Sequence, residues 1–179
     1  MKKSHKKVLI ISVILLALAA LIVFVCEAVK TKDDIAKMIQ KELALTEEET
    51  GKLSYVGEFV DDDSSLLWFT IQNGIYYENR YISVECRVVA DGRYLVEGVS
   101  KCGAWGPDIA IASLGIKDIC LIYNPDCRGF VFTTMGGGTV ISKTELSPDD
   151  LPYIFECEWP AKATELTFLN EEGNELPWG

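Results

Sequence analysis

The clearest chemical feature of this 179-residue sequence is its single histidine, His5, close to the N-terminus. His5 precedes a long apolar segment. Because it is the only histidine, the part of the chain after that segment has no imidazole. Serine and cysteine nucleophiles normally need such a base, and zinc sites use it as a ligand. The G-x-S-x-G turn of hydrolases is also missing, because the stretch 98–102 (GVSKC) lacks the closing glycine. We therefore predict no catalytic residue and no cofactor, and we expect a protein that is not an enzyme.

Paired carboxylates keep one enzymatic alternative open. Glu156 and Glu158 alternate along a predicted strand, on the face opposite Phe155, Cys157 and Trp159. Their Cα atoms should lie about 6.6 Å apart, and two acids at such a separation can hydrolyse a glycosidic bond. A solvent-facing strand edge has the same pattern, and we favour it in a chain with 27 acidic residues. A membrane-tethered hydrolase with paired carboxylates is the alternative function.

Asp61, Asp62 and Asp63 form a dense acidic cluster, followed by Ser64. Hard cations such as calcium prefer oxygen ligands, which makes these three aspartates weak candidates for a metal site. The cluster has neither the glycine kink nor the distant closing glutamate of an EF-hand loop. We therefore predict a polar hairpin turn here and no metal site.

Six cysteines are present, of which Cys26 borders the apolar segment. The other five are an odd number, so at least one is free or pairs between chains. The lack of a C-x-x-C motif argues against thioredoxin-like exchange and zinc ribbons. Cys86 and Cys157 fall on apolar strand faces, typical of buried free thiols, whereas Cys102 and Cys127 lie in or near predicted loops. The connectivity stays open, and the possible disulfide cysteines are Cys86, Cys102, Cys120, Cys127 and Cys157.

Four tryptophans are spread along the sequence. Trp68 and Trp159 fit the cores of predicted strands. Trp105, between glycines in GAWGP, and Trp178, next to the C-terminus, are the possible surface aromatics for binding.

The apolar segment runs for 18 residues from Val8 to Val25, with Ser12 as its only polar member. A helix of this length spans about 27 Å, close to the hydrocarbon core of a bilayer. Lysines at positions 2, 3, 6 and 7 precede it, which places the N-terminus in the cytoplasm. We predict a cytoplasmic stub (1–7), a transmembrane signal-anchor helix (8–25) that contacts the lipid bilayer, and an extracytoplasmic domain (30–179). The expected location is the cell membrane, with a single pass.

Two other interpretations of this segment are less favourable. A cleaved signal peptide would release a secreted protein, but the Ala17–Ala19 triplet is followed by more apolar residues rather than by the end of the run. Cys26-Glu27-Ala28 is a second possible cleavage site with a poor outer residue. A lipoprotein would need a small residue before Cys26, where Val25 stands. An uncleaved anchor is favoured.

Charge narrows the possible partners. The chain has a net charge of −10, and removing the four N-terminal lysines leaves 13 basic against 27 acidic residues, a net charge of −14 outside the membrane. Phosphates repel such a domain, so we expect no nucleic acid partner. A hydrophobic content of 49% and a charged content of 25% exclude a disordered chain and a polytopic membrane protein.

Hydrophobic periodicity predicts a mainly β (α+β) domain. Apolar residues at helical spacing predict a short amphipathic helix over 33–45, and Thr46 with Glu49 forms a capping box. From Lys52 onward the period changes to two, and 101–108 has the composition of a linker. About nine strands are expected in an antiparallel meander or sandwich, namely 53–60, 66–73, 80–89, 93–100, 116–124, 128–134, 139–146, 153–159 and 163–170.

One hairpin allows a prediction of its register. Asp91-Gly92 permits a two-residue or a three-residue loop. A three-residue loop over 90–92 pairs Cys86 with Val96 and Val88 with Tyr94, which keeps apolar residues opposite one another. We prefer this register, with Gly92 left-handed in a bulge.

The stretches GIKDICLIYNPDCRGFVF (115–132) and ATELTFLNEEGNEL (163–176) give the chain a resemblance. Together with the anchor, they resemble small uncharacterised membrane-anchored extracytoplasmic β-rich proteins of Gram-positive bacteria. The resemblance rests on strand and turn patterning, and it implies a β-rich outer domain without implying an activity. We expect a non-catalytic binding module that recognises a protein partner or ligand. A structural protein acting through its membrane helix is a third hypothesis.

Overall fold

The structure is a computed structural model that describes residue 14 and residues 28–72, 79–102, 104–106 and 108–176. The predicted transmembrane segment 8–25 therefore lies almost entirely outside the described residues. Within the described part, no helix is long and apolar enough to cross a membrane.

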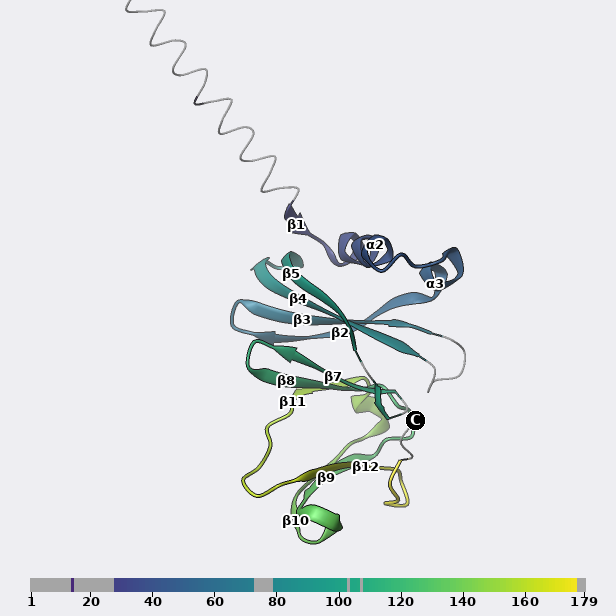
Figure 1. Cartoon of the computed structure of the whole chain (residues 1–179), viewed down its shortest axis with the longest axis vertical. Helices are drawn as coiled ribbons and strands as arrows, with labels where there is room; N and C mark the ends of the chain where they lie inside the picture. The colour runs from purple at the N-terminus through teal and green to yellow at the C-terminus, as the bar shows by residue number, and fades with distance from the viewer. Residues whose placement is uncertain (1–13, 15–27, 73–78, 103, 107, 177–179) are drawn as a thin grey trace, which may run out of the picture.

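Antiparallel strands dominate the described chain (Figure 1). The helical elements are α2 (Lys32–Glu42), α3 (Glu47–Lys52), η2 (Met135–Gly137) and η3 (Pro148–Asp150). The strands are β1 (Val29–Lys30), β2 (Leu53–Asp61), β3 (Ser64–Ile71), β4 (Arg80–Ala90), β5 (Arg93–Cys102), β6 (Ala104–Gly106), β7 (Ile109–Leu114), β8 (Lys117–Ile122), β9 (Gly129–Thr133), β10 (Val140–Glu145), β11 (Tyr153–Glu156) and β12 (Glu165–Leu169).

Three sheets lie one below another, and α2 and α3 cover the outer face of the first (Figure 1). The first sheet has the order β1-β5-β4-β3-β2, the second β11-β8-β7-β6, and the third β10-β9-β12. Every pairing is antiparallel. The prediction of a mainly β, antiparallel domain is confirmed.

The core is divided into three layers, because two of the sheets are covered on both faces. Ile35 and Ile39 of α2 pack on one face of the first sheet. The other face of the first sheet, including Trp68, packs on the second sheet. A further cluster, which includes Phe130, joins the second sheet to the third. Burial on both faces explains why β3 is apolar along most of its length instead of alternating.

The predicted hairpin register is confirmed. Cys86 pairs with Val96 and Val88 with Tyr94, and Gly92 has a positive φ of 63°. The ladder continues to a further pair, Ala90 with Arg93, so the irregularity lies between Val88 and Ala90. The predicted three-residue loop over 90–92 is therefore wrong, because the connecting turn is the two residues Asp91-Gly92 and the bulge lies at Val89 instead of Gly92.

Several strands differ from the sequence-based expectation. The linker predicted over 101–108 contains the end of β5 and the whole of β6, and β1 and β7 were not predicted. β7 (IAIASL) has apolar residues at both odd and even positions, and β1 has two residues, so neither carries a clear period-two pattern. The strand expected over 153–159 ends at Glu156, where the Glu158 N–H donates back to the Glu156 carbonyl at 3.1 Å, although the Cys157 N–H still donates to the Asp118 carbonyl at 2.7 Å in register with β8.

Both helices begin with a capping box, of which the sequence predicted one, at Thr46. The capping box of Thr46 and Glu49 is confirmed at the start of α3. A second box, from Thr31 and Asp34, begins α2, and the buried face of α2 is Ile35 and Ile39. The helix predicted over 33–45 is therefore present, although it ends at Glu42.

A charged cluster fastens the first turn of α2 to the first sheet. Lys32 Nζ donates to Tyr55 Oη at 2.8 Å and lies 3.2 Å from Glu58 Oε1. The Tyr94 hydroxyl donates to Glu58 Oε2 at 2.7 Å. Partial burial opposes the charge of Lys32, but the hydrogen bonds to Tyr55 and Glu58 outweigh it and raise the pKa of Lys32. Burial, with the hydrogen bond to Glu58, raises the pKa of Tyr94 to about 12.

Replacing Glu58 by glutamine should loosen this cluster. We expect Glu58→Gln to lower the free energy of unfolding by about 1 kcal/mol, since the cluster is partly exposed and loses charge-assisted bonds. Faster hydrogen exchange in α2 would report the same change. The control is Glu145→Gln, because Glu145 also pairs with a lysine, Lys143, but is 78% exposed. Equal effects of the two variants would show that the cluster does not hold α2.

Candidate functional site

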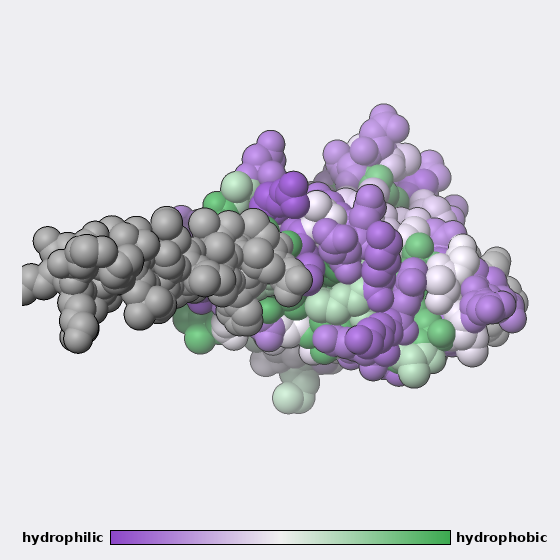
Figure 2. All heavy atoms as spheres, turned by 90° about the horizontal axis from the view of Figure 1, so that it is seen from above, coloured by the Kyte–Doolittle hydropathy of each residue, from purple (hydrophilic) through white to green (hydrophobic). Residues whose placement is uncertain are grey.

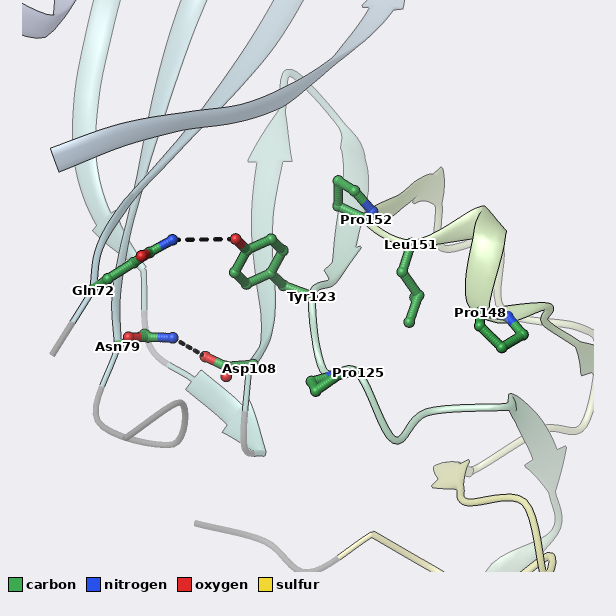
Figure 3. A pocket seen from close by; sticks show the side chains of 8 residues that line it. All are labelled: Gln72, Asn79, Asp108, Tyr123, Pro125, Pro148, Leu151 and Pro152. Atoms are coloured by element: carbon green, nitrogen blue, oxygen red, sulfur yellow. Dashed lines mark hydrogen bonds between the residues drawn. The ribbon is translucent and has the colours of Figure 1, made fainter. Parts of the chain in front are cut away.

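A cavity of about 500 Å³ opens where the first and second sheets come together at one end. We call it the Asp108 pocket (Figure 3). Asp108 and Tyr123 come from the second sheet and the segments that flank it, and Gln72 and Asn79 come from the ends of β3 and β4. The lining residues are Gln72, Asn79, Asp108, Tyr123, Pro125, Pro148, Leu151 and Pro152.

Asp108 is the chemical centre of this pocket. It directly precedes β7 and has a positive φ of 57°, a conformation that aspartate tolerates better than most residues. Its exposed fraction is 1%. The Oδ1 atom accepts hydrogen bonds from the Tyr81 hydroxyl and, at 2.9 Å, from Asn79 Nδ2. The Oδ2 atom is buried and has no hydrogen-bond partner among the described residues.

Burial governs the titration of the two groups at the bottom of the site. It raises the pKa of Asp108, against the hydrogen bonds from Tyr81 and Asn79, which favour the ionised form. Burial and the neighbouring Asp108 raise the pKa of Tyr81 far above the ordinary value of a tyrosine. Tyr81 is therefore a fixed hydrogen-bond donor at neutral pH, and Asp108 is its acceptor.

Hydrogen bonds, a ring contact and a capped turn position the other residues that line the pocket. The Tyr123 N–H donates to the Asp108 carbonyl at 2.8 Å, and the Tyr123 hydroxyl accepts from Gln72 Nε2 at 3.2 Å. The Tyr123 ring meets the Tyr81 ring edge to face, with centroids 6.4 Å apart. Pro148 begins η3, which has a capping box from Ser147 and Asp150. Figure 3 shows Pro148, Leu151 and Pro152 grouped across from Gln72, Asn79 and Asp108, with Pro125 beside Asp108, so one wall is apolar and the other is mainly polar.

The raised pKa of Asp108 implies a cost in stability that depends on pH. An acid whose folded pKa is raised destabilises the fold as pH rises above its unfolded pKa, and the cost is complete above the folded pKa. We expect Asp108→Asn to be more stable than the wild type at pH 7, by on the order of 1 kcal/mol. The difference should disappear toward pH 3. Thermal unfolding across this range is the measurement, with the exposed Asp118→Asn as control. A loss of stability at pH 7 would contradict it.

The acidic cluster predicted as a hairpin turn is one. Asp61 pairs with Ser64, and Asp62 has the positive φ of 52° that the two-residue turn requires. Asp61 Oδ2 is bound by Lys117 Nζ at 2.9 Å. No group of three or more possible metal ligands occurs in the described part of the chain.

The two glutamates of the alternative hydrolase have different surroundings. Glu156 Oε2 lies 3.1 Å from Lys117 Nζ, the same ammonium that binds Asp61. Glu158 is exposed and follows the end of β11, so the predicted alternation along one strand is wrong at this position. Neither glutamate is among the described residues that line the Asp108 pocket.

The five cysteines of the described part are all free thiols. Cys86 and Cys157 are buried, as expected, and burial raises the pKa of Cys86 to about 12 and that of Cys157 to about 11. Cys127 was a bridge candidate, but it is buried in the same cluster as Cys120 and Cys157 and its Sγ donates to the Gly129 carbonyl. The thiolate form is thus disfavoured, as in inert structural cysteines.

Of the two tryptophans predicted to lie in strand cores, one does and the other does not. Trp68 is fully buried, as expected. Trp159 lies beyond β11, is 43% exposed and packs edge-on against Phe132, so its assignment to a strand core is wrong. Trp105 lies in β6, but its side chain is outside the described residues, as is Trp178.

Asp108 does not stand out in the sequence. It lies at the end of a stretch with the composition of a linker, and its partners Asn79 and Tyr81 are 29 and 27 positions away. The one available signal is an acid placed directly before an apolar strand, IAIASL. Comparisons with protein-family models, curated proteins and solved structures found no match.

Proposed function

We propose that the chain is a single-pass membrane protein whose β-rich domain stands outside the membrane and binds a ligand, without catalysis, in the Asp108 pocket. The observation that carries the proposal is a carboxylate oxygen, Oδ2, that is buried at the pocket and has no described partner. Buried polar groups are nearly always hydrogen-bonded, so such an oxygen indicates a place for a ligand atom. Both sheets supply walls, which makes the site a property of the folded domain.

The face of the domain over α2 and α3, seen from above, does not favour a protein interface. Polar and charged residues predominate over α2 and α3, and apolar residues are scattered among them (Figure 2). Protein interfaces usually contain a contiguous apolar patch of several hundred Å². The number of acids at the site supports binding without catalysis. Asp108 is the single acid among the described lining residues, whereas a paired-carboxylate hydrolase needs two.

The proposed anchor would keep the folded domain close to the bilayer. β1 begins at Val29, four positions after the end of the apolar segment at Val25. Four residues can span at most about 14 Å. β1 pairs with β5 of the first sheet, so the folded domain would begin directly at the membrane surface.

Ligand binding can be tested with the full chain in phosphatidylcholine nanodiscs. The probes are benzylamine, benzyl alcohol and benzoate, observed by saturation-transfer NMR and corrected with empty discs. We expect at least one probe to bind the wild type and to lose binding in Pro148→Trp, which narrows the pocket. Ser142→Trp, on the exposed β10, is the control and should bind normally. Equal binding by all three proteins, or by none, would overturn the proposed site.

The anchor has a separate test. The intact mass of natively produced protein is measured in the membrane fraction, after alkylation with and without reduction. We expect the full-length mass and the same number of alkylated cysteines in both samples. A mass lacking the first 25 to 30 residues, near Cys26-Glu27-Ala28, would show a secreted protein instead.

A further inference from the structure

We propose that the ligand of the Asp108 pocket is a small organic amine in its cationic form, whose ammonium group binds Asp108 Oδ2. The inference rests on the proposed function, because it assigns a chemical class to the same site. It follows from the different roles of the two carboxylate oxygens and from the charges around them.

Asp108 Oδ1 is already saturated. A carboxylate oxygen has two lone pairs, and the Tyr81 hydroxyl and the Asn79 amide occupy both. Figure 3 shows the Asn79 bond to one oxygen of Asp108 while the other oxygen is directed away from Asn79. A ligand in the pocket therefore meets Oδ2. Since both bonds to Oδ1 are donated to Asp108, they stabilise its ionised form and make Oδ2 an acceptor.

Among the described residues, no cation of the protein balances the charge of Asp108 at the site. No lysine, arginine or histidine is among the described residues that line the pocket. The two described groups that hydrogen-bond the carboxylate, Tyr81 and Asn79, are neutral. A buried charge without a partner is costly, so a cation gains more at Oδ2 than a neutral donor does. The net charge of −14 outside the apolar segment adds a weaker, long-range attraction for cations.

The rest of the pocket suits the hydrocarbon part of an amine. Tyr123 presents an aromatic ring, and aromatic faces attract ammonium groups. The opposite wall is apolar, formed by Pro148, Leu151 and Pro152 (Figure 3). The volume of about 500 Å³ falls in the range of small-molecule sites. Apart from Asp108, none of the described lining residues carries a formal charge, which disfavours a zwitterion or an anion.

The test compares ligands that differ in charge and little in shape. Affinities of benzylammonium, benzyl alcohol and benzoate are measured at pH 7 with the full chain in phosphatidylcholine nanodiscs. We expect benzylammonium to bind about tenfold more tightly than benzyl alcohol, the difference between a charge-assisted and a neutral hydrogen bond. Benzoate should not bind. A peptide with a lysine side chain and blocked ends is included, and tighter binding of this peptide would overturn the assignment to a small molecule.

Asp108→Asn is the decisive variant, because Tyr81 and Asn79 would hold the amide oxygen at the position of Oδ1. The amide nitrogen then takes the place of Oδ2 and changes the ligand-facing atom from an acceptor to a donor. Benzylammonium should lose its about tenfold advantage, while benzyl alcohol still binds. If alcohol or benzoate is preferred by the wild type, the ammonium inference fails although the pocket stands. If no probe binds in a way that Pro148→Trp abolishes, the pocket fails as a site and the inference fails with it.

Discussion

Trp68→Ala is expected to lower the free energy of unfolding by about 3–5 kcal/mol, as is typical of truncating a buried tryptophan. Trp68 is fully buried in the cluster that joins the first sheet to the second. Removing the indole leaves a cavity between two sheets whose strands are fixed by their own ladders, so the gap cannot collapse easily. Denaturant unfolding of the full chain in micelles gives the value.

Trp68→Phe is the matched control for this prediction. Trp68 Nε1 has no hydrogen-bond partner within the described chain, so phenylalanine loses volume without losing a hydrogen bond. We expect a cost of about 1 kcal/mol, well below that of alanine. Equal costs for the two variants would show that the indole N–H is bonded and that volume does not decide the effect. Trp68→Ala should also weaken binding of the probe ligands. Trp68 packs between the first and second sheets, and these two sheets supply walls of the pocket.

Gly129→Ala is the second substitution with a large expected effect, and it should lower the free energy of unfolding by about 3 kcal/mol. A Cβ at Gly129 would lie 2.4 Å from the backbone carbonyl oxygen of Thr144, on the neighbouring strand β10. Backbone cannot move aside as a side chain does, so the β9–β10 ladder must shift. Gly129 also pairs with Leu169 of β12, so the strain reaches the whole third sheet.

Gly98→Ala provides the comparison for Gly129→Ala. Gly98 also lies in a strand, β5, but a Cβ added there would have no described atom within 4 Å outside its chain neighbours. We expect a change within about 0.5 kcal/mol. Hydrogen exchange should rise in β9, β10 and β12 for Gly129→Ala and in none of them for Gly98→Ala. Similar exchange in the two variants would contradict the close approach of β10 to Gly129.

Local patterns in the sequence predicted much of the fold. The first four strands from Leu53 onward, the capping box at Thr46 and the register of Cys86 with Val96 follow from period-two alternation, capping chemistry and turn type. These signals act over a few residues or across one hairpin. The stacking of three sheets could not be predicted in this way, because strands buried on both faces, such as β3, do not show which layer covers each face.

The candidate site lay beyond the reach of local patterns. Asp108 gains its character from Asn79 and Tyr81 on the first sheet and from burial between two sheets. Charge and spacing drew attention instead to Asp61 and Glu156, which the folded chain brings together on Lys117. Acids that are prominent in the sequence are thus neutralised at the surface, and an isolated acid supplies the buried carboxylate.

The most direct test of the Asp108 pocket is the ¹³C chemical shift of the Asp108 side-chain carboxyl group, followed against pH in the full chain. In the free protein, we expect a titration midpoint above the ordinary pKa of aspartate, because burial disfavours the ionised form. Saturating benzylamine should lower that midpoint, since a bound ammonium favours the carboxylate. An ordinary midpoint that no probe moves would show that Asp108 is neither a buried carboxylate nor part of a ligand site.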